Sequence, residues 1–174
     1  MIAMSDSIGF LYIATGDDFV EEARISAQTV DKHHPDIPIC LMTDQDATDP
    51  VFDKVMILDD PAYGFQDQIH NLDNTPFNRT IYLDTDIYAD DSVADVFDLL
   101  NQFDMAMAYN HDGKAWSVDG VPESFPEFNT GVVAYRCSGA FLDFLSLWED
   151  IYESKLEGED TMQNQPTFRQ AVYE

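Results

Sequence analysis

Short apolar runs alternate with amphipathic helical stretches along almost the whole chain, and this alternation most constrains its fold. The first run, residues 9–14, ends at Thr15-Gly16-Asp17, and residues 19–30 then carry apolar side chains at helical spacing. We expect strands over 9–14, 37–42, 54–58, 80–83, 105–109 and 132–135, and helices over 19–30, 67–72, 92–100 and 138–152, with a last helical piece from Pro166. This order predicts an α/β sandwich with a mainly parallel central sheet.

The length of 174 residues fits one domain with one core, so we treat residues 1–174 as a single unit. The last helical piece has barely begun at Glu174 and no capping residue follows it, so we expect a domain truncated at its C-terminus. In such sheets ligands bind at the carboxyl ends of the strands. Asp44, Asp84 and Asp86 all stand at such ends.

The charge balance is strongly acidic, with 8 Lys plus Arg against 34 Asp plus Glu and a formal charge of -26. The acids are spread along the whole chain, which predicts a solvated surface adapted to high salt, as in a halophile. At 1 M salt, screening shortens the reach of each charge to roughly 3 Å. The same charge argues against binding to nucleic acid or anionic lipid, which needs clustered Lys and Arg.

Neither the cysteines nor the hydropathy pattern indicates a metal-cysteine site or a membrane protein. Cys40 and Cys137 have no CxxC spacing and no third partner, so no zinc site or disulfide framework is predicted. No basic region opens the chain, and no apolar run reaches the length of a membrane span. We therefore expect no direct membrane insertion and a cytoplasmic location.

Asp84-Thr85-Asp86 directly follows the apolar segment 80–83. Residues two apart in extended backbone lie on the same side, so the two carboxylates can face one point. Mg²⁺ and Mn²⁺ are typically held by one or two carboxylates together with water and substrate phosphates. The triplet therefore predicts a metal site that a nucleotide diphosphate completes. Asp44-Gln45-Asp46 is a second such triplet, but the strand before the first one favours Asp84 and Asp86.

Other readings of this triplet can be weighed from its neighbours. A calcium EF-hand needs further oxygen ligands and a glycine where Tyr88 and Ala89 stand. A haloacid-dehalogenase phosphatase also ends a strand with two such aspartates, but normally near the N-terminus and with a small residue where Tyr88 stands. A phosphatase or nucleotidyltransferase therefore stays open as a weaker alternative.

The sequence resembles GT-A glycosyltransferases, especially the retaining family 8 group that includes glycogenin and bacterial galactosyltransferases. Three segments carry the resemblance, in the right order and spacing. Residues 82–86 match the strand and paired aspartates of that group, residues 128–133 resemble its Phe-Asn-small-Gly-Val strand, and Asn164-Gln165-Pro166 resembles its Asp-Gln segment. The resemblance implies a GT-A fold and a metal-dependent transfer of sugar from a nucleotide-diphosphate sugar, most readily a UDP-sugar, to a hydroxyl of a glycan, lipid or small molecule.

The resemblance also implies roles for individual residues. The nucleoside would lie at the end of the first strand, Asp84 would contact ribose and metal, Asp86 the metal, and Asn129 the donor sugar. A catalytic role falls to Asn129 and to the segment of Asn164 and Gln165; residues implied in donor binding are Ala14, Thr15, Gly16, Asp44, Asp84 and Gly131. Two features depart from the family: Asn164 stands where Asp is usual, and a further metal ligand, commonly His, lies beyond Glu174. A non-catalytic nucleotide-sugar-binding domain is therefore the alternative function.

Overall fold

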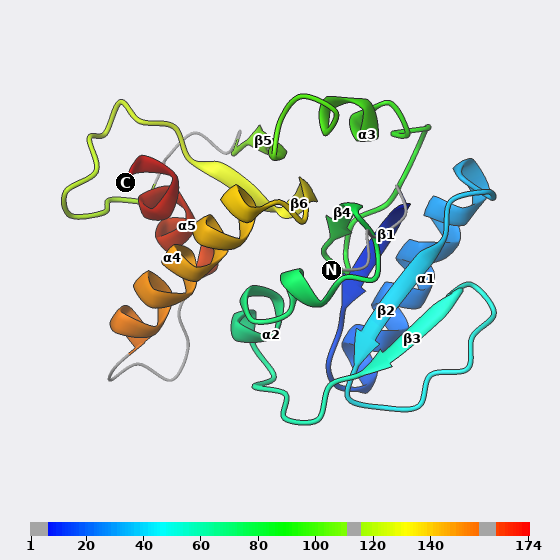
Figure 1. Cartoon of the computed structure of the whole chain (residues 1–174). Helices are drawn as coiled ribbons and strands as arrows, with labels where there is room; N and C mark the ends of the chain where they lie inside the picture. Colours follow the sequence, from blue (N-terminus) through cyan, green and yellow to red (C-terminus); the bar gives the residue numbers. More distant parts are fainter. Residues whose placement is uncertain (1–6, 111–115, 157–162) are drawn as a thin grey trace.

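The computed structural model describes residues 7–110, 116–156 and 163–174. A six-stranded sheet in the order β3-β2-β1-β4-β6-β5 forms its centre (Figure 1). The strands are β1 (Ile8–Ile13), β2 (Ile39–Thr43), β3 (Lys54–Ile57), β4 (Arg79–Leu83), β5 (Met105–Tyr109) and β6 (Phe128–Arg136). The helices are α1 (Asp17–His33), α2 (Phe65–Ile69), α3 (Val96–Leu99), α4 (Gly139–Leu156) and α5 (Asn164–Tyr173), with a 3₁₀ turn η1 (Leu72–Asn74). Only β6 runs against its neighbours in this described sheet, which confirms the mainly parallel arrangement.

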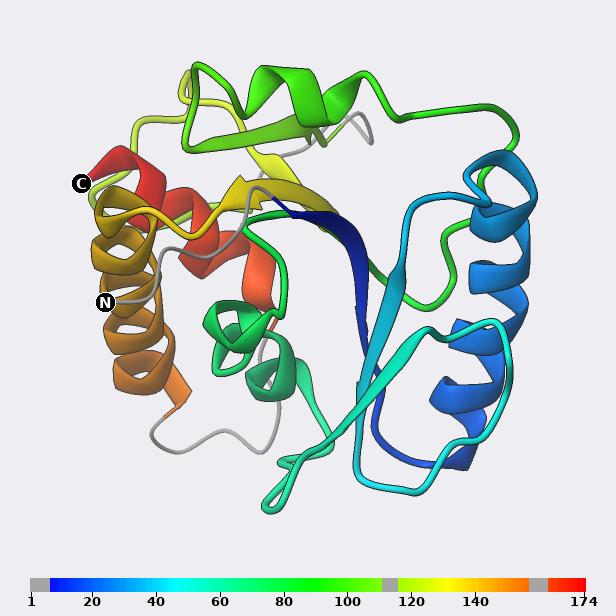
Figure 2. The same cartoon turned by 45° about the vertical axis from the view of Figure 1, so that its right-hand side comes forward.

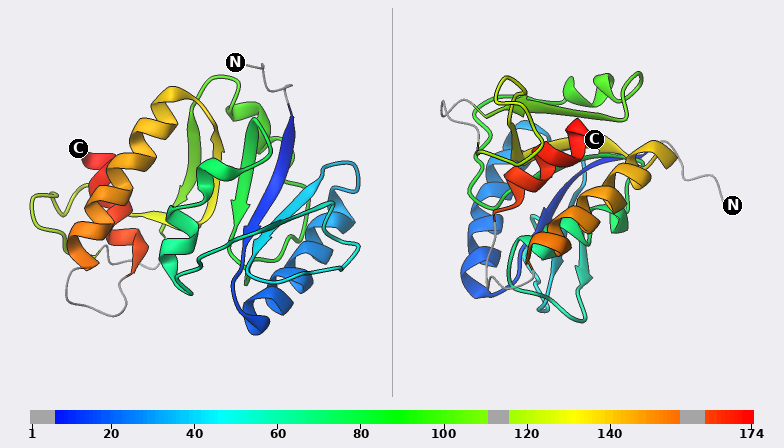
Figure 3. Two further views of the ribbon diagram at one scale, coloured as in Figure 1. Left: turned by 60° about the horizontal axis from the view of Figure 1, so that its bottom comes forward. Right: turned by 90° about the vertical axis from the view of Figure 1, so that its left-hand side faces the viewer.

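The sheet is buried on both faces, which explains why its central strands read as continuous apolar runs. Alternate residues of β1 enter different cores: Leu11 and Ile13 pack with α4 and α5, whereas Phe10 and Tyr12 pack with α1 and α3. Figure 2 shows α1 on one side of the sheet and α4 and α5 on the other, and Figure 3 shows α4 and α5 lying against each other. The structure confirms the predicted three-layer α/β/α sandwich.

Several predicted elements differ in their bounds from those observed, and two of them differ markedly. The helix predicted over 92–100 is only the four-residue α3, which begins at Val96; Ser92 Oγ lies 3.3 Å from Nε2 of His34, the residue after α1, and accepts a long hydrogen bond from the N–H of Ala94 at 3.4 Å. The strand predicted over 132–135 begins earlier, at Phe128. The sequence did not mark this start because residues 129–131 are polar or small and carry no alternating apolar pattern. The predicted cap of α4 is confirmed, since the N–H of Phe141 donates to Ser138 Oγ at 3.2 Å.

The antiparallel pairing of β4 and β6 aligns the two segments that the sequence analysis singled out. Leu83 pairs with Val132. Asp84, which follows Leu83, therefore lies opposite Gly131, which precedes Val132. The N–H of Asp84 donates to the carbonyl oxygen of Gly131 at 2.8 Å. The ends of β1 and β4 share one sheet edge, because the two strands are parallel neighbours. No helix in the described part of the chain is both long and apolar enough to cross a membrane.

Candidate functional site

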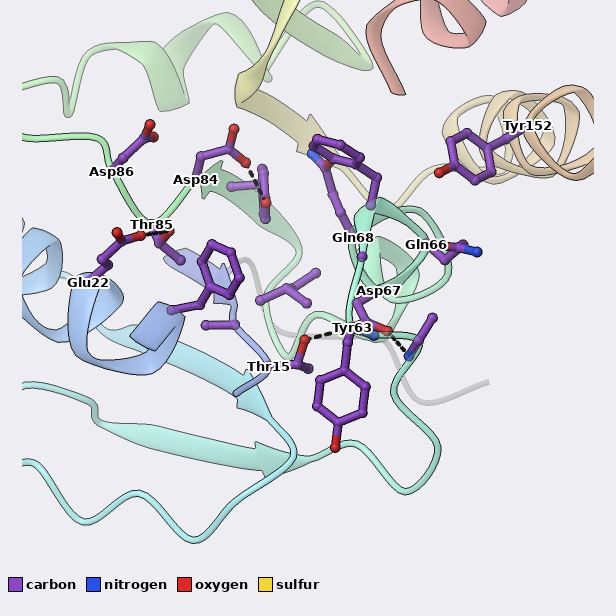
Figure 4. A pocket seen from close by; sticks show the side chains of 17 residues that line it. Thr15, Glu22, Tyr63, Gln66, Asp67, Gln68, Asp84, Thr85, Asp86 and Tyr152 are labelled. Carbon is purple, nitrogen blue, oxygen red and sulfur yellow. Dashed lines mark hydrogen bonds between the residues drawn. The ribbon is translucent and has the colours of Figure 1, made fainter. Parts of the chain in front are cut away.

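A pocket of about 600 Å³ opens at the carboxyl ends of β1 and β4, between α1 and α2 (Figure 4). Of the predicted site residues, Ala14, Thr15, Asp84 and Asp86 line it, and Gly16 lines a smaller hollow that shares Thr15 with it. The other lining residues are Ile13, Phe19, Glu22, Ala62, Tyr63, Gly64, Phe65, Gln66, Asp67, Gln68, Tyr82, Thr85 and Tyr152. Asp44, Asn129, Gly131, Asn164 and Gln165 lie outside this lining, and their surroundings are described below.

Asp84 and Asp86 project in the same direction beyond the end of β4 (Figure 4). The hydroxyl of Tyr82 donates to Asp84 Oδ1 at 2.7 Å. Burial raises the pKa of Asp84 to about 6; the hydrogen bond from Tyr82 opposes this shift, and the charge of Asp86 adds to it. The site therefore holds a partly desolvated carboxylate beside a second one, an arrangement that a positive charge would stabilise.

This pair of carboxylates fits a hard divalent cation. The described residues that line the pocket include four acids, Glu22, Asp67, Asp84 and Asp86, and no Lys, Arg or His. Among the described residues no group of three acidic, His or Cys side chains is placed to hold a metal. Asp84 and Asp86 could thus supply two oxygen ligands, with the remaining ligands coming from water or from the phosphates of a bound molecule, as Mg²⁺ and Mn²⁺ commonly accept.

Gly131 lies against the carboxylate of Asp84. A Cβ at position 131 would stand 2.7 Å from Asp84 Oδ2 and 3.2 Å from Asn129 Oδ1. The side chain of Asn129 accepts a hydrogen bond from the N–H of Gly131 at 2.9 Å. The structure thus brings Asn129 and Gly131 next to Asp84, although neither lines the open pocket.

The end of β1 is held by two acids from other segments. Thr15 Oγ1 donates to Asp67 Oδ2 at 2.7 Å, and the N–H of Gly16 donates to Asp44 Oδ1 at 3.0 Å. The Gly16 hydrogen bond is the main reason why the pKa of Asp44 is lowered. Gly16 has a φ of 85, which favours glycine there. Asp44 thus holds the backbone of Gly16 just after β1 and does not line the larger pocket itself.

Tyr63 stands at the mouth of the pocket in a strained conformation. Its φ is 57, the only positive φ of a non-glycine residue in the described ranges. Its hydroxyl bonds to the carboxylate of Asp44, which raises the pKa of Tyr63. Tyr63 is 65% exposed, and Phe19, also in the lining, is 55% exposed. Two largely exposed aromatic residues therefore stand at this end of the pocket.

Asn164 and Gln165, the first two residues of α5, lie next to β6. Asn164 is 2% exposed: it accepts a hydrogen bond from Thr130 Oγ1 at 3.1 Å and donates one to Gln68 Oε1 at 2.5 Å. Gln165 Oε1 accepts a long hydrogen bond, 3.5 Å, from the N–H of Thr130. Both residues thus hydrogen-bond to Thr130, which lies between Asn129 and Gly131. They contact the segment beside Asp84, although neither lines the open pocket.

The sequence analysis missed the anchoring of the loop after β4. One face of α1 holds this loop through Glu22 to Thr85 (2.9 Å), Ser26 to the carbonyl of Ile87, and Thr29 to the N–H of Ala89 (2.9 Å). His34, at the end of the helix, accepts from the N–H of Val93 at 2.9 Å. Residues 22, 26 and 29 have the spacing of one helix face, a polar pattern that could have been recognised.

Asp67 and Gln68 were missed as well, and no sequence signal indicates them. They occupy a helix of five residues, too short to show a periodic pattern, and the partners that connect them to β1 and β6, Thr15 and Thr130, lie 52 and 62 residues away along the chain.

The mostly parallel six-stranded sheet, covered by helices on both faces, is the fold of the GT-A glycosyltransferases, as comparison with solved structures shows. The chain matches solved structures of this class over most of its length. The galactosyltransferase LgtC, in complex with donor and acceptor sugar analogues, aligns with a TM-score of 0.66 at 14% identity, covering 95% of this chain and 70% of that one. The apo form of the glycosyltransferase GlyE of Streptococcus pneumoniae aligns with a TM-score of 0.67 at 15% identity, covering 95% of this chain and 43% of GlyE.

TarS of S. aureus aligns more loosely, with a TM-score of 0.51 at 13% identity over 95% of this chain and 55% of its own residues 1–349. The chain thus spans less than half of GlyE and little more than half of that TarS segment. No family model and no curated protein sequence matches the chain. At these identities the structural likeness establishes the fold.

Proposed function

We propose that the chain is the donor-binding domain of a metal-dependent glycosyltransferase, which moves a sugar from a nucleotide-diphosphate sugar to an acceptor hydroxyl. One observation carries the proposal: on a GT-A fold, Asp84 and Asp86 stand together in a pocket whose described lining has four acids and no cationic side chain. A diphosphate would be repelled from such a pocket. It could enter only with a divalent cation between it and the carboxylates, and we propose Mn²⁺ or Mg²⁺.

The chemistry that the cation supplies when bound is Lewis-acid neutralisation of the charge that develops on the departing nucleoside diphosphate. The protein's own contribution is positional. Asp84 is fixed by its backbone hydrogen bond to Gly131 and by the hydroxyl of Tyr82, and Thr85 between the two aspartates is held by Glu22. These contacts would hold Asp84 and the start of the loop that carries Asp86 in position for the cation.

We place the nucleoside of the donor at the end of β1. Thr15 lines the pocket there, and the exposed side chains of Phe19 and Tyr63 offer aromatic surfaces on which a base can stack. A UDP-sugar is the proposed donor, and a solved TarS structure that aligns with a TM-score of 0.52 contains UDP. The acceptor would be a glycan, a lipid or a small molecule that bears a hydroxyl.

The sugar would lie on the other side of the metal, beside Asn129 and Gly131. Asn129 stays a proposed sugar contact, and Asn164 and Gln165 are proposed to act on the same segment through Thr130. A glutamine belongs to the active site of LgtC, since an active-site variant with glutamate in its place has been solved and aligns with a TM-score of 0.63. Gln165 is our candidate for a comparable role.

Hydrolysis and transfer assays test this function. Purified protein in molar KCl with Mn²⁺ should release UDP from UDP-galactose or UDP-N-acetylglucosamine, and Asp84→Asn and Asp86→Asn should each lose at least about tenfold of that rate. Asp90→Asn, an exposed carboxylate in the same loop and outside the pocket, should keep it. Release of phosphate from phosphomonoesters, without release of UDP, would favour the phosphatase alternative and contradict the proposal.

Asn164 favours a second candidate, a domain that binds a nucleotide sugar without transferring it. Its side chain is neutral, buried and hydrogen-bonded at both its oxygen and its nitrogen, so it offers no carboxylate to the reacting centre. Donor binding that needs Mn²⁺, combined with no UDP release toward any sugar acceptor or water, would select this candidate over the transferase.

A further inference from the structure

Two consecutive buried residues of α2, Asp67 and Gln68, reach opposite sides of the pocket. Successive residues of a helix point roughly 100° apart, so one short helix can direct its two neighbouring side chains to two different strands. Figure 4 shows Asp67 turned toward Thr15 and Gln68 lying on the other side of the helix. The inference below rests on the proposed function, because it assigns these residues a task in donor binding.

Asp67 fixes the side where we place the nucleoside. Its carboxylate accepts three hydrogen bonds: from Thr15 Oγ1 at 2.7 Å, from the N–H of Ala62 at 2.6 Å and from the N–H of Tyr63 at 2.9 Å. The last two hold the loop that keeps Tyr63 at its positive φ. Such a conformation is unfavourable for a residue with a side chain and persists only where its surroundings impose it.

Gln68 fixes the side where we place the sugar. Its Nε2 donates to the carbonyl oxygen of Thr130 at 2.9 Å, and its Oε1 accepts from Asn164 Nδ2 at 2.5 Å. The carbonyl of Thr130 can only accept, which sets the orientation of the Gln68 amide and leaves Oε1 facing Asn164. An aspartate at 164 would instead put an acceptor against that acceptor. Asn164 and Gln68 are therefore chemically matched.

We propose that Asp67 and Gln68 are positioning residues that set the spacing between the two halves of the donor site. Asp67 acts through Thr15 and Tyr63 at the end of β1, and Gln68 acts through Thr130 on the segment of Asn129 and Gly131. Because both belong to one turn of helix, a displacement of α2 would move the nucleoside side and the sugar side together.

The test separates the two sides by their ligands. In molar KCl with Mn²⁺, Asp67→Ala should weaken binding of UDP and of UDP-galactose by the same factor, about tenfold. Gln68→Leu should keep the dissociation constant for UDP within about twofold of the wild-type value. It should lower the UDP-release rate at saturating UDP-galactose about tenfold. Gln68→Glu keeps an acceptor for Asn164 but sets a carboxylate oxygen against the carbonyl of Thr130, so it should lower the UDP-release rate at least as far as Gln68→Leu. Gln28→Leu, on the exposed side of α1, is the control and should match wild type.

Amide exchange tests the contacts even if the protein proves to bind no nucleotide sugar, in which case only the proposed function fails. Asp67→Ala should speed exchange at residues 62–63 and not at 128–131, and Gln68→Leu should do the reverse, because each side chain contacts one of these segments. Equal changes in both segments for both variants, or unchanged exchange in either, would overturn the proposal. So would a loss of UDP affinity in Gln68→Leu as large as in Asp67→Ala.

Discussion

The carboxylate of Asp84 occupies the space into which any side chain at position 131 would extend. The antiparallel register of β4 and β6 sets this contact, because it pairs Leu83 with Val132 and so brings Asp84 opposite Gly131. The N–H of Asp84 also donates to the carbonyl oxygen of Gly131 at 2.8 Å, which holds the two strands together at this point. A glycine on one strand thus shapes the proposed metal site on the next.

Gly131→Ala should therefore damage the metal site more than the fold. The added Cβ would lie 2.7 Å from Asp84 Oδ2, so the carboxylate must rotate away. We expect Mn²⁺-dependent UDP binding to weaken at least about tenfold and the free energy of unfolding to fall by about 1 to 3 kcal/mol. Gly139→Ala, where no atom lies within 4 Å of the new Cβ, is the matched control and should bind like wild type. Normal metal-dependent binding by Gly131→Ala would show that this contact does not shape the site.

The raised pKa of Asp84 predicts a specific pH dependence of stability without divalent cations. Burial raises this pKa to about 6, so folding favours the protonated acid, and stability present near pH 4 is lost as the pH rises through 6. Asp84→Asn stays neutral and should be more stable than wild type at pH 7.5, by up to about 3 kcal/mol, with the difference shrinking toward pH 4. Urea unfolding of both proteins in molar KCl measures this. A difference that does not change with pH would contradict it.

Arg169 should be essential for the shape of the segment between β5 and β6. It is 1% exposed, and its guanidinium donates to the carbonyl oxygens of Trp116, Pro122 and Phe125 at distances from 2.6 to 3.2 Å. Arg169→Met would leave these carbonyls without their donor, and we expect a loss of about 3 kcal/mol in urea unfolding. Arg24→Met removes the partly exposed ion pairs with Glu21 and Asp49 and should cost under about 1 kcal/mol. Equal losses in the two variants would refute this role of Arg169.

Salt should stabilise the protein strongly at neutral pH. The formal charge of -26 repels itself across the folded surface, and salt screens this repulsion. Thermal melts should show a Tm that rises from low to molar KCl at pH 7.5. Near pH 4.1, the isoelectric point, most of this dependence should disappear. A Tm that is the same in low and molar KCl at pH 7.5 would contradict the prediction of a salt-adapted surface.

The sequence was sufficient for the parts of the fold that follow from local pattern. The apolar runs before Thr15 and Asp84 predicted two parallel strands whose ends share an edge, and these residues do meet in one pocket. The segment of Asn129 and Gly131 was recognised by its resemblance to a family, and the register of β6 brings it to Asp84.

What could not be predicted depends on long-range contacts of single polar side chains. Asp67 meets Thr15 across 52 residues, and Gln68 meets Asn164 across 96, with no periodic pattern to mark either. The prediction of a helix from Ser92 was wrong as well: α3 begins only at Val96, and the Ser92 hydroxyl contacts the ring of His34, 58 residues earlier. Asn164, predicted as a catalytic group, lies in this buried network, and its role in a reaction stays a proposal.

The most direct measurement of the central claim is calorimetric titration of UDP into the protein in molar KCl, with Mn²⁺ and again with EDTA. The acidic lining of the pocket predicts binding with Mn²⁺ and none with EDTA, and loss of the Mn²⁺-dependent binding in both Asp84→Asn and Asp86→Asn. Asp90→Asn should bind like wild type. Binding of equal strength in EDTA, or unchanged binding by the two aspartate variants with Mn²⁺, would contradict the claim that these carboxylates hold a donor through a metal.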